Sequence, residues 1–242
     1  MDIFWIIIIL AALGPIIGSF IGIIKKPSNV FMYNMLSFAA GVMLAISFLE
    51  LIPESIHLSS AWYTILGVIL GSVTMYSLDK LIPHIHPGLC LPEQGTRLKK
   101  TSIYLLIGIS MHNFPEGMAM AIGVVTEVKL GLLVALAIMI HDIPEAVCTS
   151  APYFYSTGKR IKSFLVSSST AIPTILGFLF AHFLYQYISS TVVGIIIAAT
   201  AGLMIYISAD ELIPVSCKQT TTHSTIFSLI MGILAVILLG ML

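Results

Sequence analysis

The sequence has few charged residues. Only 9% of its 242 residues are Asp, Glu, Lys or Arg, whereas a water-soluble domain has about 25%. Hydrophobic residues make up 58% of the chain, and the mean hydropathy is +1.04. The formal net charge is zero, so charge gives no reason to expect a nucleic acid or an acidic partner. This composition is typical of an integral membrane protein.

Several motifs are also missing. The three cysteines, Cys90, Cys148 and Cys217, are scattered and form no CxxC, so neither a disulfide framework nor a structural zinc site is predicted. The absence of a Walker motif argues against ATP-driven transport by this polypeptide alone. No basic segment precedes the first apolar run, which is therefore predicted to be a transmembrane helix rather than a cleavable signal peptide.

Eight apolar runs can be marked by their polar breaks. They span residues 3–24, 34–53, 61–79, 102–125, 130–150, 163–187, 191–213 and 225–242. Each has about the 17–25 residues needed to cross the hydrocarbon core of a bilayer. The longest connection, 80–101, leaves no room for a separate soluble domain. We therefore expect an all-α polytopic protein with a single membrane domain over residues 1–242.

The basic residues predict the orientation. Ten of the eleven Lys and Arg residues lie in the connections after the first, third, fifth and seventh runs, and only Lys129 lies on the other side. Because cytoplasmic loops carry the excess of Lys and Arg, these four connections are expected in the cytoplasm and both termini outside.

The second and seventh runs contain an internal repeat. The segment from Gly41 to Pro53 matches the segment from Gly202 to Pro214 at seven positions, Gly-x-Met-x-x-x-Ser-x-x-Glu-Leu-Ile-Pro. In the predicted topology these two helices cross the membrane in opposite directions. Matching sequences in opposite orientation indicate inverted-topology repeats, which build many secondary transporters. On that interpretation Glu50 marks an outer vestibule and Glu211 an inner one. The alternative is that each carboxylate only caps a membrane end.

Two polar clusters interrupt the fourth and fifth runs. They read His112-Asn-Phe-Pro-Glu-Gly117 and His141-Asp-Ile-Pro-Glu145. In each cluster His and Glu are four residues apart, so an α-helix places them on one face. The intervening proline cannot donate a backbone hydrogen bond and frees the carbonyl four residues earlier. Ionisable groups and broken backbone at membrane depth are tolerated where they line a functional cavity.

Placed side by side, the two clusters predict a metal site. The candidate ligands are two imidazoles, three carboxylates and one amide: His112, Asn113, Glu116, His141, Asp142 and Glu145. Imidazole nitrogen with carboxylate oxygen suits borderline divalent ions such as Zn²⁺ and Fe²⁺. Three carboxylates at membrane depth would repel one another unless a divalent cation or protons offset them.

At this point the sequence resembles a known family. The paired motifs are similar to the signature of the ZIP (Zrt-, Irt-like) divalent-metal transporters, in particular the compact bacterial members of the GufA-like and ZupT-like type. The resemblance covers nearly the whole chain, and it implies eight helices, external termini, a homodimer and no prosthetic group. It also implies that helices 1, 4, 5 and 6 form a bundle that shifts against helices 2, 3, 7 and 8.

The family likeness implies a binuclear site in which both glutamates bridge. The first position would use His112, Glu116, His141, Glu145 and Met43 of helix 2, and the second would use Asn113, Glu116, Asp142 and Glu145. Many relatives have Gln where this chain has His141, and the imidazole should favour borderline metals. Many also place a Glu before the proline of helix 6, where this chain has Ile172. We therefore expect a weak or absent second position and one well-held ion.

The function implied is import of Zn²⁺, with Fe²⁺, Mn²⁺ or Cd²⁺ as broader substrates, into the cytoplasm across the cell membrane. The implied route runs from His57 and Glu50, through the central site, to Asp210 and Glu211. His84, His86 and Cys90 could capture metal transiently or form a plain loop. The alternatives are an intramembrane metalloenzyme, for which the chain lacks His-Glu-x-x-His, and a metal sensor, for which it has no signalling domain.

Overall fold

The computed structural model describes residues 3–24, 27–81, 96–218 and 223–241, and every regular element in these residues is a helix. The bounds of the α-helices are α1 (Ile3–Ile24), α2 (Asn29–Ile46), α3 (Ile52–Leu58), α4 (Ala61–Leu81), α5 (Thr96–Thr126), α6 (Val128–Thr157), α7 (Arg160–Ser168), α8 (Ala171–Leu184), α9 (Ser190–Ile207), α10 (Ile213–Lys218) and α11 (Ser224–Gly240). Three short helices of other types are η1 (Ser47–Leu51), η2 (Tyr185–Tyr187) and η3 (Ser208–Leu212).

In the described residues these elements form eight helical segments. η1 joins α2 to α3, η3 joins α9 to α10, and α7, α8 and η2 together make one segment, Arg160–Tyr187. Six segments are long and apolar enough to cross a membrane: Ile3–Ile24, Asn29–Leu58, Ala61–Lys80, Val128–Thr157, Arg160–Tyr187 and Ser190–Cys217. Helix α5 has 31 residues, and the apolar α11 is shorter, with 17. Large apolar side chains such as Trp62 and Phe227 are exposed on the outside, where lipid would meet them. The predicted all-α polytopic membrane fold is confirmed.

Most of the predicted segments differ from those observed in their bounds, and two of the differences have a clear physical cause. The second helix begins at Asn29 rather than residue 34, because the Ser28 side chain accepts a hydrogen bond from the Phe31 N–H (3.2 Å) and caps it. The sixth is broken between α7 and α8. Pro173 has no N–H to donate to Ser169, whose carbonyl accepts instead from the Ile172 N–H (3.0 Å) in a tighter turn. A hydropathy pattern shows neither feature, because the start of the second helix lies among polar residues and the break in the sixth depends on a single proline.

The repeated segments share an unusual backbone. η1 and η3 are π-helical turns of five residues, and they occupy equivalent positions, each ending just before Ile-Pro. In both, the N–H of the following isoleucine donates to the carbonyl of the serine five residues earlier, Ser47 or Ser208. π-helical turns are rare. Because one such turn occurs in each copy, the internal repeat is present in the backbone structure as well as in the sequence.

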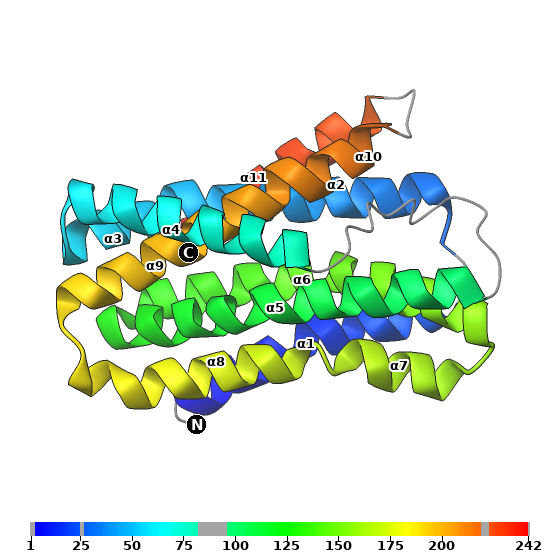
Figure 1. Ribbon diagram of the computed structural model, residues 1–242, viewed down its shortest axis with the longest axis horizontal. Helices are drawn as coiled ribbons and strands as arrows, with labels where there is room; N and C mark the ends of the chain where they lie inside the picture. The colour runs from blue at the N-terminus through cyan, green and yellow to red at the C-terminus, as the bar shows by residue number, and fades with distance from the viewer. Residues whose placement is uncertain (1–2, 25–26, 82–95, 219–222, 242) are drawn as a thin grey trace.

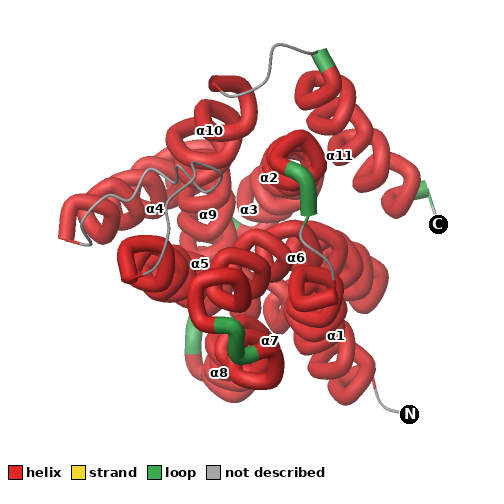
Figure 2. The backbone as a smooth tube through the Cα atoms, turned by 90° about the vertical axis from the view of Figure 1, so that its right-hand side faces the viewer, coloured by secondary structure: helices red, strands yellow, loops and turns green. Residues whose placement is uncertain are grey.

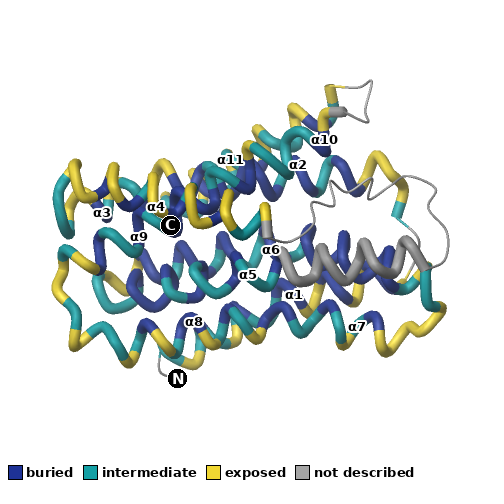
Figure 3. Tube along the Cα trace, in the orientation of Figure 1, coloured by how far each residue is buried: buried dark blue, intermediate teal, exposed yellow. Residues whose placement is uncertain are grey.

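The helices form two halves with α5 and α6 in the middle of the molecule. Figure 1 shows the helices running roughly parallel to the long axis, and Figure 2, seen along that axis, shows α1, α7 and α8 on one side of α5 and α6. Helices α2, α4, α9 and α11 lie on the other side. Figure 3 shows that burial is concentrated along α6, the described part of α5, and α2. The first, fourth, fifth and sixth predicted helices, which are α1, α5, α6 and α7–α8, therefore pack together. The second, third, seventh and eighth, which are α2–α3, α4, α9–α10 and α11, also pack together.

The packing obeys a pseudo-two-fold relation. Helix α1 packs on α6 as α8 packs on α5, α2 packs on α11 as α9 packs on α4, and α2 meets α6 as α9 meets α5. Glycines mark the closest contacts: a Cβ at Gly41 would collide with the carbonyl of Leu229 on α11, and one at Gly202 with that of Val68 on α4. Small residues let membrane helices approach this closely. The contact pattern is that of an inverted repeat.

Candidate metal centre

The predicted ligands come together between α5 and α6. His112, Asn113 and Glu116 lie on α5, and His141, Asp142 and Glu145 on α6. All six are buried, with no more than 3% of any residue exposed. Both helices continue through their internal prolines, Pro115 and Pro144, in surroundings where neighbouring helices exclude lipid. That is the environment in which interrupted backbone is tolerated at membrane depth.

The histidines and glutamates pair crosswise between the two helices. His112 Nε2 lies 3.1 Å from Glu145 Oε2, and His141 Nε2 lies 3.3 Å from Glu116 Oε1. The crossing arises because α5 and α6 are antiparallel, so the first residue of one motif is level with the last residue of the other. The site is thus two His–Glu pairs stacked along the helix axes.

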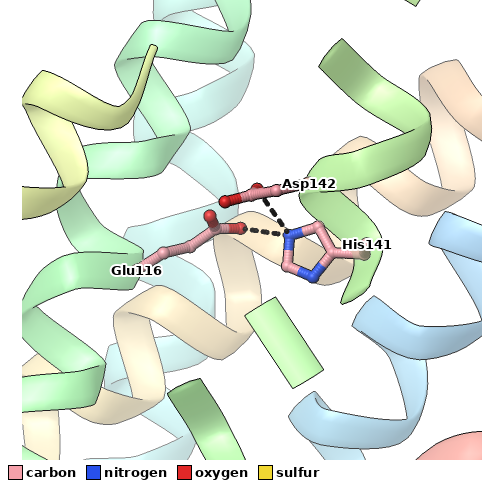
Figure 4. Close-up of side chains that lie close together, drawn as sticks. All are labelled: Glu116, His141 and Asp142. Atoms are coloured by element: carbon pink, nitrogen blue, oxygen red, sulfur yellow. Dashed lines mark ion pairs between the residues drawn. The ribbon is translucent and has the colours of Figure 1, made fainter. Parts of the chain in front are cut away.

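The His141 ring is oriented for ligation. Its Nδ1 lies 3.1 Å from the Ala137 carbonyl and donates to it, which leaves the Nε2 lone pair available. That nitrogen lies 3.3 Å from Glu116 and 3.6 Å from Asp142 Oδ1 (Figure 4). One ligand atom from each of the three residues can be chosen so that all lie within 4.8 Å of one another. Three electron-pair donors that converge in a buried space could hold a cation.

Asn113 is held by the broken sixth helix. Its Nδ2 donates to the Thr170 carbonyl (2.9 Å) at the break between α7 and α8, and its Oδ1 has no hydrogen-bond partner. An amide that donates on one side presents its oxygen on the other. Sequence reasoning missed Thr170. The available signal was the polar run Ser167–Thr170 followed by Pro173 in a helix otherwise apolar.

Several buried polar atoms of the site lack hydrogen bonds. They are Asn113 Oδ1, both Glu116 oxygens, His141 Nε2, both Asp142 oxygens and Glu145 Oε1. Roughly 90% or more of buried polar groups are paired in proteins, and leaving one unpaired costs about 1–3 kcal/mol, more when it is charged. A divalent cation would satisfy this set of oxygen and nitrogen atoms together.

Close helix packing fixes both halves of the site. A Cβ at Gly14 of α1 would lie 2.5 Å from the Met139 carbonyl oxygen and 2.7 Å from the Asp142 Cβ. On the other side, a Cβ at Gly117 would collide with the Thr174 carbonyl of α8. The small residues of α1 and α5 therefore let neighbouring helices press directly on the backbone that carries the ligands.

The expectation for Ile172 is corrected by the structure. Its side chain is 55% exposed, so a carboxylate at this position would point away from the buried cluster. Thr174, two residues later, is fully buried beside Gly117 and its Oγ1 has no hydrogen-bond partner. The break at Ser169–Thr170 sets this register, which a count from Pro173 could not reveal. Thr174 is thus one of the positions of α8 that face α5, as is Gly177, whose Cβ would collide with the Phe114 carbonyl.

The other predicted residues that the structure describes lie on helices other than α5 and α6. Met43 is fully buried on α2. Glu50 is partly buried and His57 exposed near one end of the bundle, where Glu50 interacts electrostatically with Glu127 and Lys129 of the α5–α6 connection. Asp210 and Glu211 lie at the opposite end, around Tyr206, whose hydroxyl donates to Asp79 Oδ2 (3.4 Å). His84, His86 and Cys90 lie outside the described residues.

Comparisons with known proteins agree with this geometry. The family model described as "ZIP Zinc transporter" matches residues 84–241. The chain is 34% identical over 236 residues to the zinc transporter ZupT of Escherichia coli O127:H6, covering 94% of this chain and 91% of that protein. The ZupT of Escherichia coli K12 (strain DH10B) is similar to the same extent.

Proposed function

Because the chain belongs to the ZIP zinc transporter family, we propose that it carries Zn²⁺ across the membrane through the buried site between α5 and α6. The observation that carries this proposal is the convergence of buried oxygen and nitrogen atoms without hydrogen bonds, from Glu116, His141 and Asp142, within the membrane-spanning bundle. As a member of a transporter family the protein is not an enzyme, and the intramembrane metalloenzyme is set aside. The metal sensor has no observation in its favour.

The ion enters near Glu50 and His57 and leaves near Asp210 and Glu211. These acidic ends are related by the repeat and lie at opposite ends of the bundle, with the central site between them. The excess of Lys and Arg after α1, α4, α6 and α10 supports a cytoplasmic location for the end that carries Asp210 and Glu211. On that orientation, transport runs inward. The protein works in the cell membrane, as a homodimer by family likeness.

The ligand set favours Zn²⁺, with Fe²⁺, Mn²⁺ and Cd²⁺ as weaker substrates. Two imidazoles and carboxylate oxygens suit borderline metals better than the hard ions Mg²⁺ and Ca²⁺, which prefer oxygen alone. The second metal position proposed from Asn113, Glu116, Asp142 and Glu145 has no carboxylate from α8. One ion is therefore held at a time.

Uptake of radioactive zinc by proteoliposomes tests the proposal. Wild-type protein should load zinc down its concentration gradient without ATP, and His112→Ala and Glu145→Ala should abolish the flux. Lys162→Ala is the control, because Lys162 is exposed on α7 and belongs neither to the buried cluster nor to the acidic ends of the proposed route. All variants should elute as the wild type in size-exclusion chromatography. Unchanged flux in the two site variants would reject the central site.

A further inference from the structure

The pseudo-two-fold relation of the helices extends into the site. It maps one crosswise pair onto the other: His112 and Glu145 form one pair, and His141 and Glu116 form the other. Because His112 and Glu116 are four residues apart on α5, the two pairs are separated by about 6 Å along the bundle. Each pair is a half-site with one imidazole and one carboxylate. The pair containing His112 is the one nearer to Asp210 and Glu211.

Two buried methionines obey the same relation. Met43 on α2 and Met204 on α9 occupy equivalent positions in the repeat, and both are fully buried. Each methionine lies two residues after a glycine that packs against an outer helix: Gly41 packs against α11, and Gly202 packs against α4. Positions two apart on an α-helix lie about 200° apart around its axis. Both thioethers are therefore directed to the inner side of their helices, toward α6 and α5 respectively.

One contact gives the level of Met204. The Thr200 hydroxyl, which also donates to the Ile196 carbonyl of its own helix (3.1 Å), lies 3.5 Å from the Pro115 carbonyl oxygen, so α9 lies beside α5 just before Glu116. Met204 is one turn further along the same face of α9. Since α9 and α5 run in opposite directions, that turn leads back along α5 to the level of His112. By the two-fold relation, Met43 lies at the level of His141.

We propose that Met204 is a metal ligand that supplies a thioether to a second station, formed with His112 and Glu145. Met43 serves the first station in the same way, with His141, Glu116 and Asp142. A single ion passes from the first station to the second. Each station offers an imidazole, a glutamate and a thioether, and the first has Asp142 as a further carboxylate. Thioether sulfur suits Zn²⁺ and Cd²⁺ better than Mn²⁺. This inference rests on the proposed transport function.

X-ray absorption at the cadmium edge tests the second station. Protein with Cys90, Cys148 and Cys217 replaced by alanine is loaded with one equivalent of Cd²⁺, so that any sulfur neighbour is a methionine. Sulfur scattering should persist in Met43→Leu, because the ion then rests at the Met204 station. It should disappear when Met204→Leu is added. Met43→Leu with Met120→Leu is the matched control, since Met120 is also fully buried but lies outside the repeat, and it should keep its sulfur.

The outcomes are distinct. Loss of sulfur scattering in Met43→Leu alone, its absence from the wild-type ligand set, or its survival in the Met43→Leu/Met204→Leu double variant would each overturn the assignment of Met204. Exchange of Met for Leu conserves volume and costs less than about 1.5 kcal/mol, so the variants should fold. Zinc uptake measured on the same preparations separates the two proposals. Wild-type uptake with an overturned Met204 result rejects only the station, whereas absent wild-type uptake rejects the transport function.

Discussion

Replacing Gly14 by alanine should disturb the metal centre without touching a ligand. A Cβ at this position would lie 2.5 Å from the Met139 carbonyl oxygen and 2.7 Å from the Asp142 Cβ, where 3.4–4 Å is ordinary contact. Both neighbours belong to α6 and cannot rotate away. Helices α1 and α6 must therefore separate locally by about 1 Å, since a close-packed interior has no free space to absorb the methyl group.

The size of the effect follows from two opposing contributions. Overpacking of this kind costs about 1–3 kcal/mol, and replacing a helical glycine by alanine returns up to about 1 kcal/mol. The net destabilisation is about 1–2 kcal/mol, which for a chain of this length lowers Tm by about 2–8 °C. Thermal unfolding in detergent, followed by size-exclusion chromatography, measures this shift. Zinc uptake should fall as well, because Asp142 moves relative to Glu116.

Gly240→Ala is the matched control. A Cβ there would lie 3.6 Å from Leu133 Cδ1 and 3.7 Å from Glu50 Oε1, which are ordinary contacts. Its Tm should equal or slightly exceed that of the wild type, because only the helical gain of alanine over glycine remains, and its uptake should equal that of the wild type. If Gly14→Ala also retained the wild-type Tm and flux, the close packing of α1 against α6 would not position the ligands, and this reasoning would be refuted.

Three further predictions concern metal binding and stability. Zn²⁺ at about one hundred times its Kd should raise the free energy of unfolding by about 2.7 kcal/mol, and Glu116→Gln should remove most of the corresponding thermal shift. Thr174→Glu should increase the amount of zinc bound per chain, because residue 174 faces α5, whereas Ile172→Glu should leave it unchanged. Elemental analysis after gel filtration measures both amounts. The same amount of zinc in the two variants would contradict the register of α8. Gly158→Ala should cost about 1–2 kcal/mol because the backbone there is left-handed (φ 67°), with zinc affinity unaltered; a wild-type Tm would argue against that turn.

Much of the fold could be predicted from the sequence because the bilayer constrains it. A membrane span must be long, apolar and internally hydrogen-bonded, so the apolar runs located the eight segments. The repeat was also visible, since Gly41–Pro53 and Gly202–Pro214 match without a gap. Features set by single backbone hydrogen bonds were not visible. The π-helical turns and the break at Ser169–Thr170 leave hydropathy unchanged.

The sequence could predict which polar residues of α5 and α6 lie close together, but not how they pair. His and Glu four residues apart, twice, identified the two helices, and the structure buries all six predicted ligands together. The crosswise pairing of His112 with Glu145 depends on the register of two antiparallel helices, which no single motif contains. The anchoring of Asn113 to the Thr170 carbonyl and of His141 to the Ala137 carbonyl depends on backbone groups, which a list of side chains omits.

The two π-helical turns have a consequence for tolerance to changes in length. A turn that closes over five residues holds one residue more than an α-helix requires, so η1 and η3 each contain a surplus residue. Deleting one residue from a regular helix such as α4 rotates everything beyond it by about 100° and buries the wrong face. A deletion within Ser47–Leu51 or Ser208–Leu212 would instead convert the turn to ordinary α-helix and leave both flanking faces in place. The helices that carry the repeat are thus the ones best able to lose a residue.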